Sequence, residues 1–203
     1  MKQNKIENPS QAQIEQIIIL FNQGKLLDVI KKTKLLITKY PNSIFLWNIL
    51  GVSHARQKKL RNAKKCFENS IKIKPNFVEA HYNLGKTQKE LGNLSDAASS
   101  YMEAIKLKPD FAEAYNNLGN IHKDTGKFSN AISSYMEAIK LKSNYSEANY
   151  NLANTQKELG NLTDAISSYM EAIKIKPDYS EAYNELGGTQ IELGNIKDAK
   201  SSY

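Results

Sequence analysis

Residues that build disulfide-stabilised, metal-binding or membrane-spanning proteins are scarce in this sequence. One cysteine, Cys66, stands among 203 residues, which excludes an internal disulfide framework and a cysteine-rich metal site. The longest apolar run, residues 17–21, is far shorter than the roughly 20 residues that a membrane-spanning helix requires. Residues 1–13 also lack the apolar segment of a secretory signal peptide. We therefore expect a cytoplasmic protein that has no membrane partner.

Patterns that would indicate catalysis or a bound cofactor are also scarce. Serine pairs such as Ser99-Ser100 have no neighbouring histidine to act as a base, so nucleophilic catalysis has no support. The segment 84–87 resembles the end of a phosphate-binding loop, but Ala80 stands where that motif needs glycine. The three histidines are not spaced as ligands on one helical turn. We expect no catalytic residue, no cofactor and no metal.

Charge is unevenly distributed along the chain. Residues 1–77 carry 15 lysines and arginines against 4 acidic residues, whereas residues 78–203 carry 13 against 17. The basic part could attract nucleic acid, but it has no interleaved aromatic residues on which bases could stack. A solvated basic face explains it more simply, so nucleic acid ranks third among the partners considered.

The few glycines and prolines recur at one fixed interval, which is the step from Gly51 to Gly85 and again from Gly85 to Gly119. Two segments one interval long, 78–111 and 146–179, agree at 26 of 34 positions. Such self-similarity is typical of stacked repeat architectures. The interval divides the chain into a disordered N-terminal tail, residues 1–9, and six repeats, the last incomplete: 10–43, 44–77, 78–111, 112–145, 146–179 and 180–203.

Each repeat has the pattern of two helices. In the third repeat, residues 79–90 predict a first helix, and Gly92 follows as the expected left-handed cap. A second helix is predicted from Ser95, and Pro109 ends it because proline cannot continue the hydrogen-bond ladder. The sequence thus predicts an all-α fold.

Small and large residues alternate at fixed positions of the two helices. A glycine inside a helix costs about 1 kcal/mol relative to alanine, so its recurrence predicts close packing against the partner helix. The small residues of the first helix are Gly51, Gly85, Gly119, Ala153 and Gly187, and those of the second are Ala63, Ala97, Ala131, Ala165 and Ala199. The aromatic residues expected to fill the remaining space are Phe67, Tyr101, Tyr135, Tyr169 and Tyr203.

These positions carry a family resemblance. The order aromatic, Leu-Gly, Ala, aromatic, Ala, Pro within one interval resembles the tetratricopeptide repeat, and the second repeat shows it as Trp47, Leu50, Gly51, Ala63, Phe67, Ser70 and Pro75. Ser143 departs from the proline position, and Gln13 and Ile17 depart from the aromatic and glycine positions of the first repeat. The resemblance implies a right-handed α-solenoid of helix-turn-helix repeats whose first helices line a concave groove.

The resemblance also implies which residues face that groove. They are Asn83, Lys86, Lys89, Glu90, Asn117, Asn120, Lys123, Asp124, Asn151, Asn154, Lys157 and Glu158. Stacked asparagines can both donate to and accept from the backbone of an extended peptide, and this row resembles the groove of the repeat arm of O-linked N-acetylglucosamine transferases. The lysines would select acidic side chains. The alternative is that duplicated repeats carry the same asparagines without using them.

Two functions remain open for such a scaffold. The first is a non-catalytic protein that binds a peptide or partner helix in its groove. The second is a substrate-recruiting arm of a larger glycosyltransferase or sulfotransferase, since the sixth repeat stops at Tyr203 before its proline position. An uncapped last helix would expose apolar surface and could pair two chains.

Overall fold

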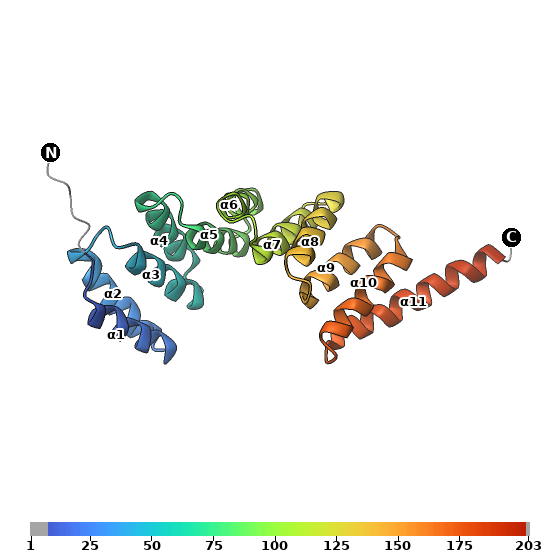
Figure 1. The fold of residues 1–203 in the computed structure, drawn as a ribbon, viewed down its shortest axis with the longest axis horizontal. Coiled ribbons are helices and arrows are strands. Elements are labelled where there is room, and N and C mark those ends of the chain that lie inside the picture. The colour runs from blue at the N-terminus through green and yellow to red at the C-terminus, as the bar shows by residue number, and fades with distance from the viewer. Residues whose placement is uncertain (1–7, 202–203) are drawn as a thin grey trace. The chain divides into compact units, whose positions relative to one another are not determined.

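A computed structural model describes the backbone of residues 8–201 and the side chains of residues 8–194 (Figure 1). Within this range the chain forms only α-helices, which confirms the predicted all-α repeat fold. The helices are α1 (Gln11–Asn22), α2 (Leu26–Lys39), α3 (Ile44–Arg56), α4 (Leu60–Ile73), α5 (Val78–Glu90), α6 (Leu94–Leu107), α7 (Ala112–Asp124), α8 (Phe128–Leu141), α9 (Ser146–Glu158), α10 (Leu162–Ile175) and α11 (Ser180–Ser201). The predicted tail, residues 1–9, lies outside the described residues except for Asn8 and Pro9, which precede α1.

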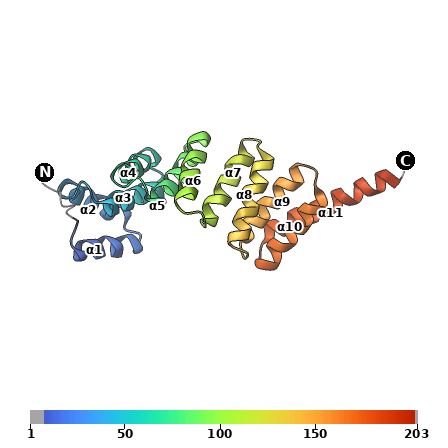
Figure 2. The same cartoon turned by 45° about the horizontal axis from the view of Figure 1, so that its top comes forward.

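The helices group into two compact blocks. The N-terminal block, Met1–Leu107, holds α1 to α6, and the C-terminal block, Lys108–Tyr203, holds α7 to α11. Inside each block the helices form consecutive pairs, as the turned view also shows (Figure 2). The repeat period alone predicts no division, but each repeat of such an array contacts mainly its neighbours, so the array can divide between any two repeats.

A residue in the left-handed backbone conformation lies in the turn between the two helices of each pair from α1–α2 to α9–α10. Gly24, Gly92, Gly126 and Gly160 have φ between 72° and 80°, a conformation that glycine adopts without a Cβ clash. Gly92 thus confirms the predicted cap of α5. Lys58 holds the corresponding position of the second repeat with φ 57°, where a side chain is sterically disfavoured.

Close contact between the glycines and the aromatic rings confirms the predicted packing. A Cβ atom added to Gly51 would lie 2.6 Å from the Phe67 ring, and one added to Gly119 would lie 2.6 Å from the Tyr135 ring. The rings of Phe67, Tyr101, Tyr135 and Tyr169 are almost fully buried. In these repeats the ring of the second helix occupies the space that a side chain on the first helix would need, and the fifth repeat has only the small Ala153 there.

In the first repeat the large residue lies on the first helix and the smaller residue on the second, the reverse of the later repeats. Ile17 occupies the position of Gly51, and Thr33 occupies the position of Phe67. Both are fully buried, and Ile17 packs with Val29, Leu36 and Leu46. A large residue on α1 thus replaces a large residue on α2, which explains why the degenerate first repeat still forms a helix pair.

The sixth repeat does not contain the turn that the sequence predicts. α11 continues without a break from Ser180 to Ser201, through Gly194, where the other repeats turn. Gly194 therefore lies inside a helix, whereas Gly92, Gly126 and Gly160 are left-handed residues in turns. The side chains of Ala199 and Tyr203, expected on that second helix, lie outside the described residues. A Cβ added to Gly187 would meet no atom of the described residues within 4 Å.

None of the helices described between residues 8 and 201 is long and apolar enough to cross a bilayer.

Candidate functional site

A hollow in the N-terminal block gathers three of the predicted groove residues. Asn83, Lys86 and Glu90 of α5 face the end of α3 across a cavity of about 320 Å³. Its apolar lining comes from Val52, Ala55 and Phe67, and Arg56, Lys58 and Thr87 complete it. Lys89, also predicted at the groove, is half-buried and does not line this hollow.

Positive charge dominates this hollow. Lys58 Nζ lies 2.8 Å from Glu90 Oε2, so that pair is internally neutralised. The guanidinium of Arg56 stacks 4.2 Å from the Phe21 ring, and Lys86 Nζ lies 5.7 Å from the Tyr82 ring. An aromatic ring attracts a cation without neutralising it, so Arg56 and Lys86 leave the hollow with a net positive charge.

A second hollow lies in the C-terminal block between α7, α9 and α11. Its volume is about 430 Å³, and its lining residues are Lys123, Tyr150, Asn154, Lys157, Glu158, Glu185 and Glu192. Lys123 Nζ lies 2.8 Å from Glu158 Oε1, and Lys157 Nζ lies 2.9 Å from Glu185 Oε2. These two lysines are therefore already paired with carboxylates of the chain itself, and an acidic ligand would have to compete with them.

Tyrosine hydroxyls fix two of the predicted asparagines. The Tyr135 hydroxyl donates to Asn120 Oδ1 at 2.7 Å, and the Tyr169 hydroxyl donates to Asn154 Oδ1 at 2.6 Å. Burial raises the pKa of both phenols, so they remain protonated donors at neutral pH. With its oxygen occupied in this way, each amide presents its NH₂ group as the part available to a ligand.

A chain of polar side chains links α7 to α9. Asn151 Nδ2 donates to Asn116 Oδ1 at 3.1 Å, and Asn116 Nδ2 donates to Glu147 Oε1 at 3.2 Å. Asn116 is almost fully buried, so these bonds satisfy an amide that water cannot reach. Asn117 and Asp124 also lie on α7, half-buried and exposed respectively, and neither lines the C-terminal hollow.

Sequence reasoning missed Arg56, Lys58 and the buried Asn116. Arg56 stands one repeat interval before Glu90, and the same position holds Asp124 and Glu158 in later repeats. This reversal of charge at one repeat position was the available signal. The bond from Asn116 to Asn151 had no such signal, because it depends on how α7 packs against α9.

The titratable groups of the core offer no reactive side chain to either hollow. Burial raises the pKa of the Cys66 thiol to about 11, which keeps it protonated and weakly nucleophilic. Within the part of the chain that the structure describes, no cluster of histidine, cysteine and acidic residues could hold a metal ion.

Two histidines make the stability of the fold depend on pH. Burial lowers the pKa of His54 and of His122, and nearby lysines, Lys34 and Lys59 for His54 and Lys127 for His122, lower it further. The unfolded chain therefore binds protons more readily than the folded chain below about pH 6.5. Stability should be fully present above that pH and should fall as the pH drops through the folded pKa values.

We expect urea unfolding at about pH 5.5 to show a lower midpoint than at about pH 7.5, because the histidines gain protons on unfolding. Replacing both with glutamine should flatten this dependence, since Gln88 and Gln156 occupy the same repeat position and each accepts a serine hydroxyl at 2.7 Å. An unchanged pH dependence in that variant would contradict the assignment.

Comparison with known proteins identifies the family. A model of the TPR repeat matches residues 51–92, 89–126, 119–160 and 157–194. The chain belongs to the TPR repeat family. The match begins at residue 51 and so leaves the first TPR repeat, with its exchanged Ile17 and Thr33, outside the matched range.

Curated relatives share only a short segment with this TPR protein. The peroxisomal targeting signal receptors of Candida glabrata and Saccharomyces cerevisiae are each 35% identical over 52 residues. The match covers 26% of this chain, and 9% and 8% of the two receptors.

Solved TPR structures match over most of the chain. MamA aligns with a TM-score of 0.75 at 20% identity, covering 80% of this chain and 95% of MamA. YrrB, described as a TPR protein with an unusual peptide-binding site, aligns with a TM-score of 0.74 at 19% identity, covering 91% of this chain and 94% of YrrB. MamA of Desulfovibrio magneticus RS-1 aligns with a TM-score of 0.78 at 14% identity, covering 86% and 98%. These likenesses establish the fold.

Proposed function

We propose that this TPR protein is a non-catalytic scaffold that binds an extended peptide segment of a partner protein along its first helices. The observation that carries the proposal is the orientation of Asn120 and Asn154. The Tyr135 and Tyr169 hydroxyls hold both amide oxygens, which leaves the NH₂ groups of two half-buried asparagines, one repeat apart, as the donors for a ligand. The backbone carbonyls of an extended peptide supply acceptors that repeat along the chain, and they match such a row without requiring a particular sequence.

Each hollow, taken within its own block, would favour different side chains of a bound peptide. In the N-terminal block, Arg56 and Lys86 lie beside an apolar lining and favour an acidic side chain next to an apolar one. In the C-terminal block, the ion pairs of Lys123 and Lys157 already neutralise the lysines, so the peptide backbone contributes more there. The peptide-binding site named for YrrB and the targeting-signal recognition named for the yeast receptors agree with this class of function.

Removing the asparagine row tests the proposal. We expect the combined substitution Asn83→Ala, Asn120→Ala and Asn154→Ala to weaken peptide binding by roughly tenfold to a hundredfold, because each lost hydrogen bond contributes about 0.5–1.5 kcal/mol. The probe is the tightest binder from a random library of peptides about 12 residues long with a central proline, which prevents a helical binding mode. Fluorescence anisotropy measures its affinity for the full chain.

Exposed asparagines on the second helices supply the matched control. Asn62 of α4 and Asn130 of α8 are exposed, so replacing both with alanine removes the same chemical group without touching the hollows. Circular dichroism should show unchanged helicity in both variants. Equal affinity of the triple variant and the parent would contradict the proposal and favour asparagines that are carried by repeat duplication alone.

A recruiting arm of a glycosyltransferase or sulfotransferase is the alternative that the sequence predicts. It would use the same peptide-binding surface, so the asparagine variants test the binding step common to both alternatives.

A further inference from the structure

The outward face of α2 exposes two leucines. Leu27 is 69% exposed and Leu35 is 71% exposed, and they lie eight residues apart on the same side of the helix, with Lys31 midway between them. Isolated exposed leucines are common on protein surfaces, so their exposure alone indicates nothing. Their positions in the repeat are more informative.

Every later second helix has a polar residue at both leucine positions. The position of Leu27 holds Arg61, Ser95, Ser129 and Thr163, and the position of Leu35 holds Asn69, Glu103, Glu137 and Glu171. The helix pair therefore does not need an apolar residue there in order to fold. Leucine at both positions on one face of α2 points to a contact that only this helix makes.

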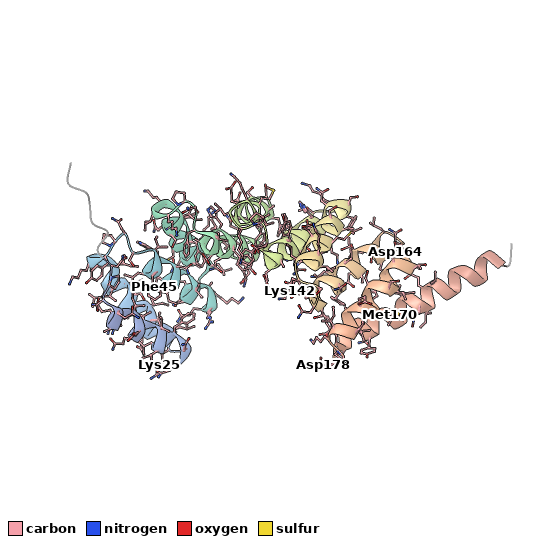
Figure 3. All side chains as sticks on the ribbon, viewed as in Figure 1. Lys25, Phe45, Lys142, Asp164, Met170 and Asp178 are labelled. Atoms are coloured by element: carbon pink, nitrogen blue, oxygen red, sulfur yellow. The ribbon has the colours of Figure 1, made fainter. Side chains whose placement is uncertain are left out.

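The face also carries two lysines, Lys32 and Lys34, at positions where no later second helix has a cation. Lys34 occupies the position of Met102, Met136 and Met170, the last labelled in Figure 3. Lys32 occupies the position of Cys66, and its ammonium donates to the side chain of Gln16 on α1. Across the later repeats the position of Leu35 holds glutamate three times, so α2 lacks the carboxylate that α6, α8 and α10 carry there.

A hollow beside α2 makes this surface concave. It has a volume of about 680 Å³ and lies between α1 and α2, with Leu20 and Leu35 forming apolar lining. Lys31, Lys32 and Lys34 surround it, against a single acidic residue, Asp28. The α1–α2 groove, as we name these six residues together with Leu27, thus has an apolar floor and a basic rim.

We propose that the α1–α2 groove binds an amphipathic helix of a partner protein whose apolar stripe is flanked by acidic residues. Apolar side chains of the bound helix fill the hollow over Leu20 and Leu35. A further apolar side chain covers Leu27, about two helical turns from Leu35. Its carboxylates meet Lys31, Lys32 and Lys34, which a basic or neutral helix would not complement. A hollowed surface suits inserted side chains, whereas a bilayer presents a broad plane of headgroups to a flat or convex face.

This groove is distinct from the site of the proposed function. The peptide-binding residues lie on first helices from α3 onward, and none of them lines the α1–α2 groove. One chain can therefore hold an extended segment and a helix at once. Either proposal can be contradicted without affecting the other, because the asparagine variants leave the α1–α2 groove intact.

Selection from a helix library tests the groove. The library displays helical peptides about 18 residues long, with randomised apolar and charged positions, and it is selected against the full chain. The counter-target is the double variant Leu27→Ser and Leu35→Glu, which restores the residues found at Ser95 and Glu103 of the third repeat. We expect the enriched helices to carry leucine-like residues along one stripe with aspartate or glutamate beside it.

Affinity measurements then quantify the effect. The best peptide should bind the double variant at least about tenfold more weakly than the parent, and its binding should weaken as salt is raised. The matched control replaces two exposed methionines of the C-terminal block, Met136→Ser and Met170→Ser, and should bind like the parent. Both leucines are exposed, so thermal unfolding of the double variant should match that of the parent.

Three results would overturn the proposal: no helix enriched on the parent over the double variant, enriched helices without acidic residues, or equal affinity for parent and variant. Vesicles of phosphatidylcholine with about 30% phosphatidylserine provide the remaining arm. Binding to these vesicles that the double variant loses, without a selected helix, would assign the surface to an anionic membrane instead.

Discussion

Replacing Gly119 with valine should lower the free energy of unfolding by about 2–3 kcal/mol, the range typical of an overpacked core. The first added carbon would lie 2.6 Å from Tyr135 Cε1, closer than real Cβ atoms approach their neighbours. The ring cannot move aside easily, because it is fully buried and its hydroxyl is bonded to Asn120 at 2.7 Å. Valine has a somewhat better helix propensity than glycine, by a few tenths of a kcal/mol, which is too little to offset the clash.

Two other substitutions at the same repeat position separate the clash from helix propensity. Gly119→Ala should have a smaller effect, because Ala153 holds this position against Tyr169 in the fifth repeat. Gly187→Ala should stabilise α11 by about 0.5–1 kcal/mol, since its Cβ meets nothing within 4 Å and alanine favours the helix. Urea unfolding followed by circular dichroism measures all three. A Gly119→Val protein as stable as the parent would show that the helix pair opens without cost.

The exchanged pair of the first repeat should show strong energetic coupling. Ile17→Gly alone should cost about 3–5 kcal/mol, because it empties a fully buried site and places glycine inside a helix. Thr33→Phe alone should also destabilise, since it adds a ring at a fully buried position opposite the large Ile17. Together they restore the combination of Gly51 with Phe67, so the double variant should be more stable than the sum of the single effects predicts.

The measurement is a double-mutant cycle with the free energy of unfolding taken from urea curves. Simple additivity of the two single effects would mean that the residues do not share one packing site. A matched control combines Ile17→Gly with Thr125→Phe, at an exposed residue in the other block, and these two effects should add.

Much of the fold follows from the repeat pattern, because every later repeat packs a small residue of its first helix against an aromatic ring of its second. The sequence therefore predicts the contact of Gly85 with Tyr101, and by the same spacing that of Gly119 with Tyr135. The separate second helix expected to carry Ala199 was wrong, because α11 runs through Gly194 without a turn. The caps at Gly92 and Gly126 show that the same residue turns the chain where such a helix is present.

The site follows less completely from the sequence. The resemblance to the tetratricopeptide repeat placed Asn154 and Lys157 at the same groove, and both line one hollow, because the assignment depends only on which face of a helix a residue occupies. It gave no information on partners, so the ion pair of Lys157 with Glu185 and the bond of Asn154 with Tyr169 were not predicted. Those contacts depend on distances between helices of different repeats. The leucines of α2 were not singled out, because a leucine in an amphipathic helix ordinarily indicates the buried face.

Near-identity of the repeats has a kinetic consequence. The third and fifth repeats, 78–111 and 146–179, differ at few positions, so a folding chain offers Gly85 two almost equivalent rings, Tyr101 and Tyr169. Pairing of helices from the wrong repeats would bury similar surface before it is corrected, and repeat proteins are prone to such traps. Ile17 cannot accept a tyrosine ring at all. The first helix pair therefore cannot form with a second helix from another repeat, and it fixes the register in which the following repeats pack.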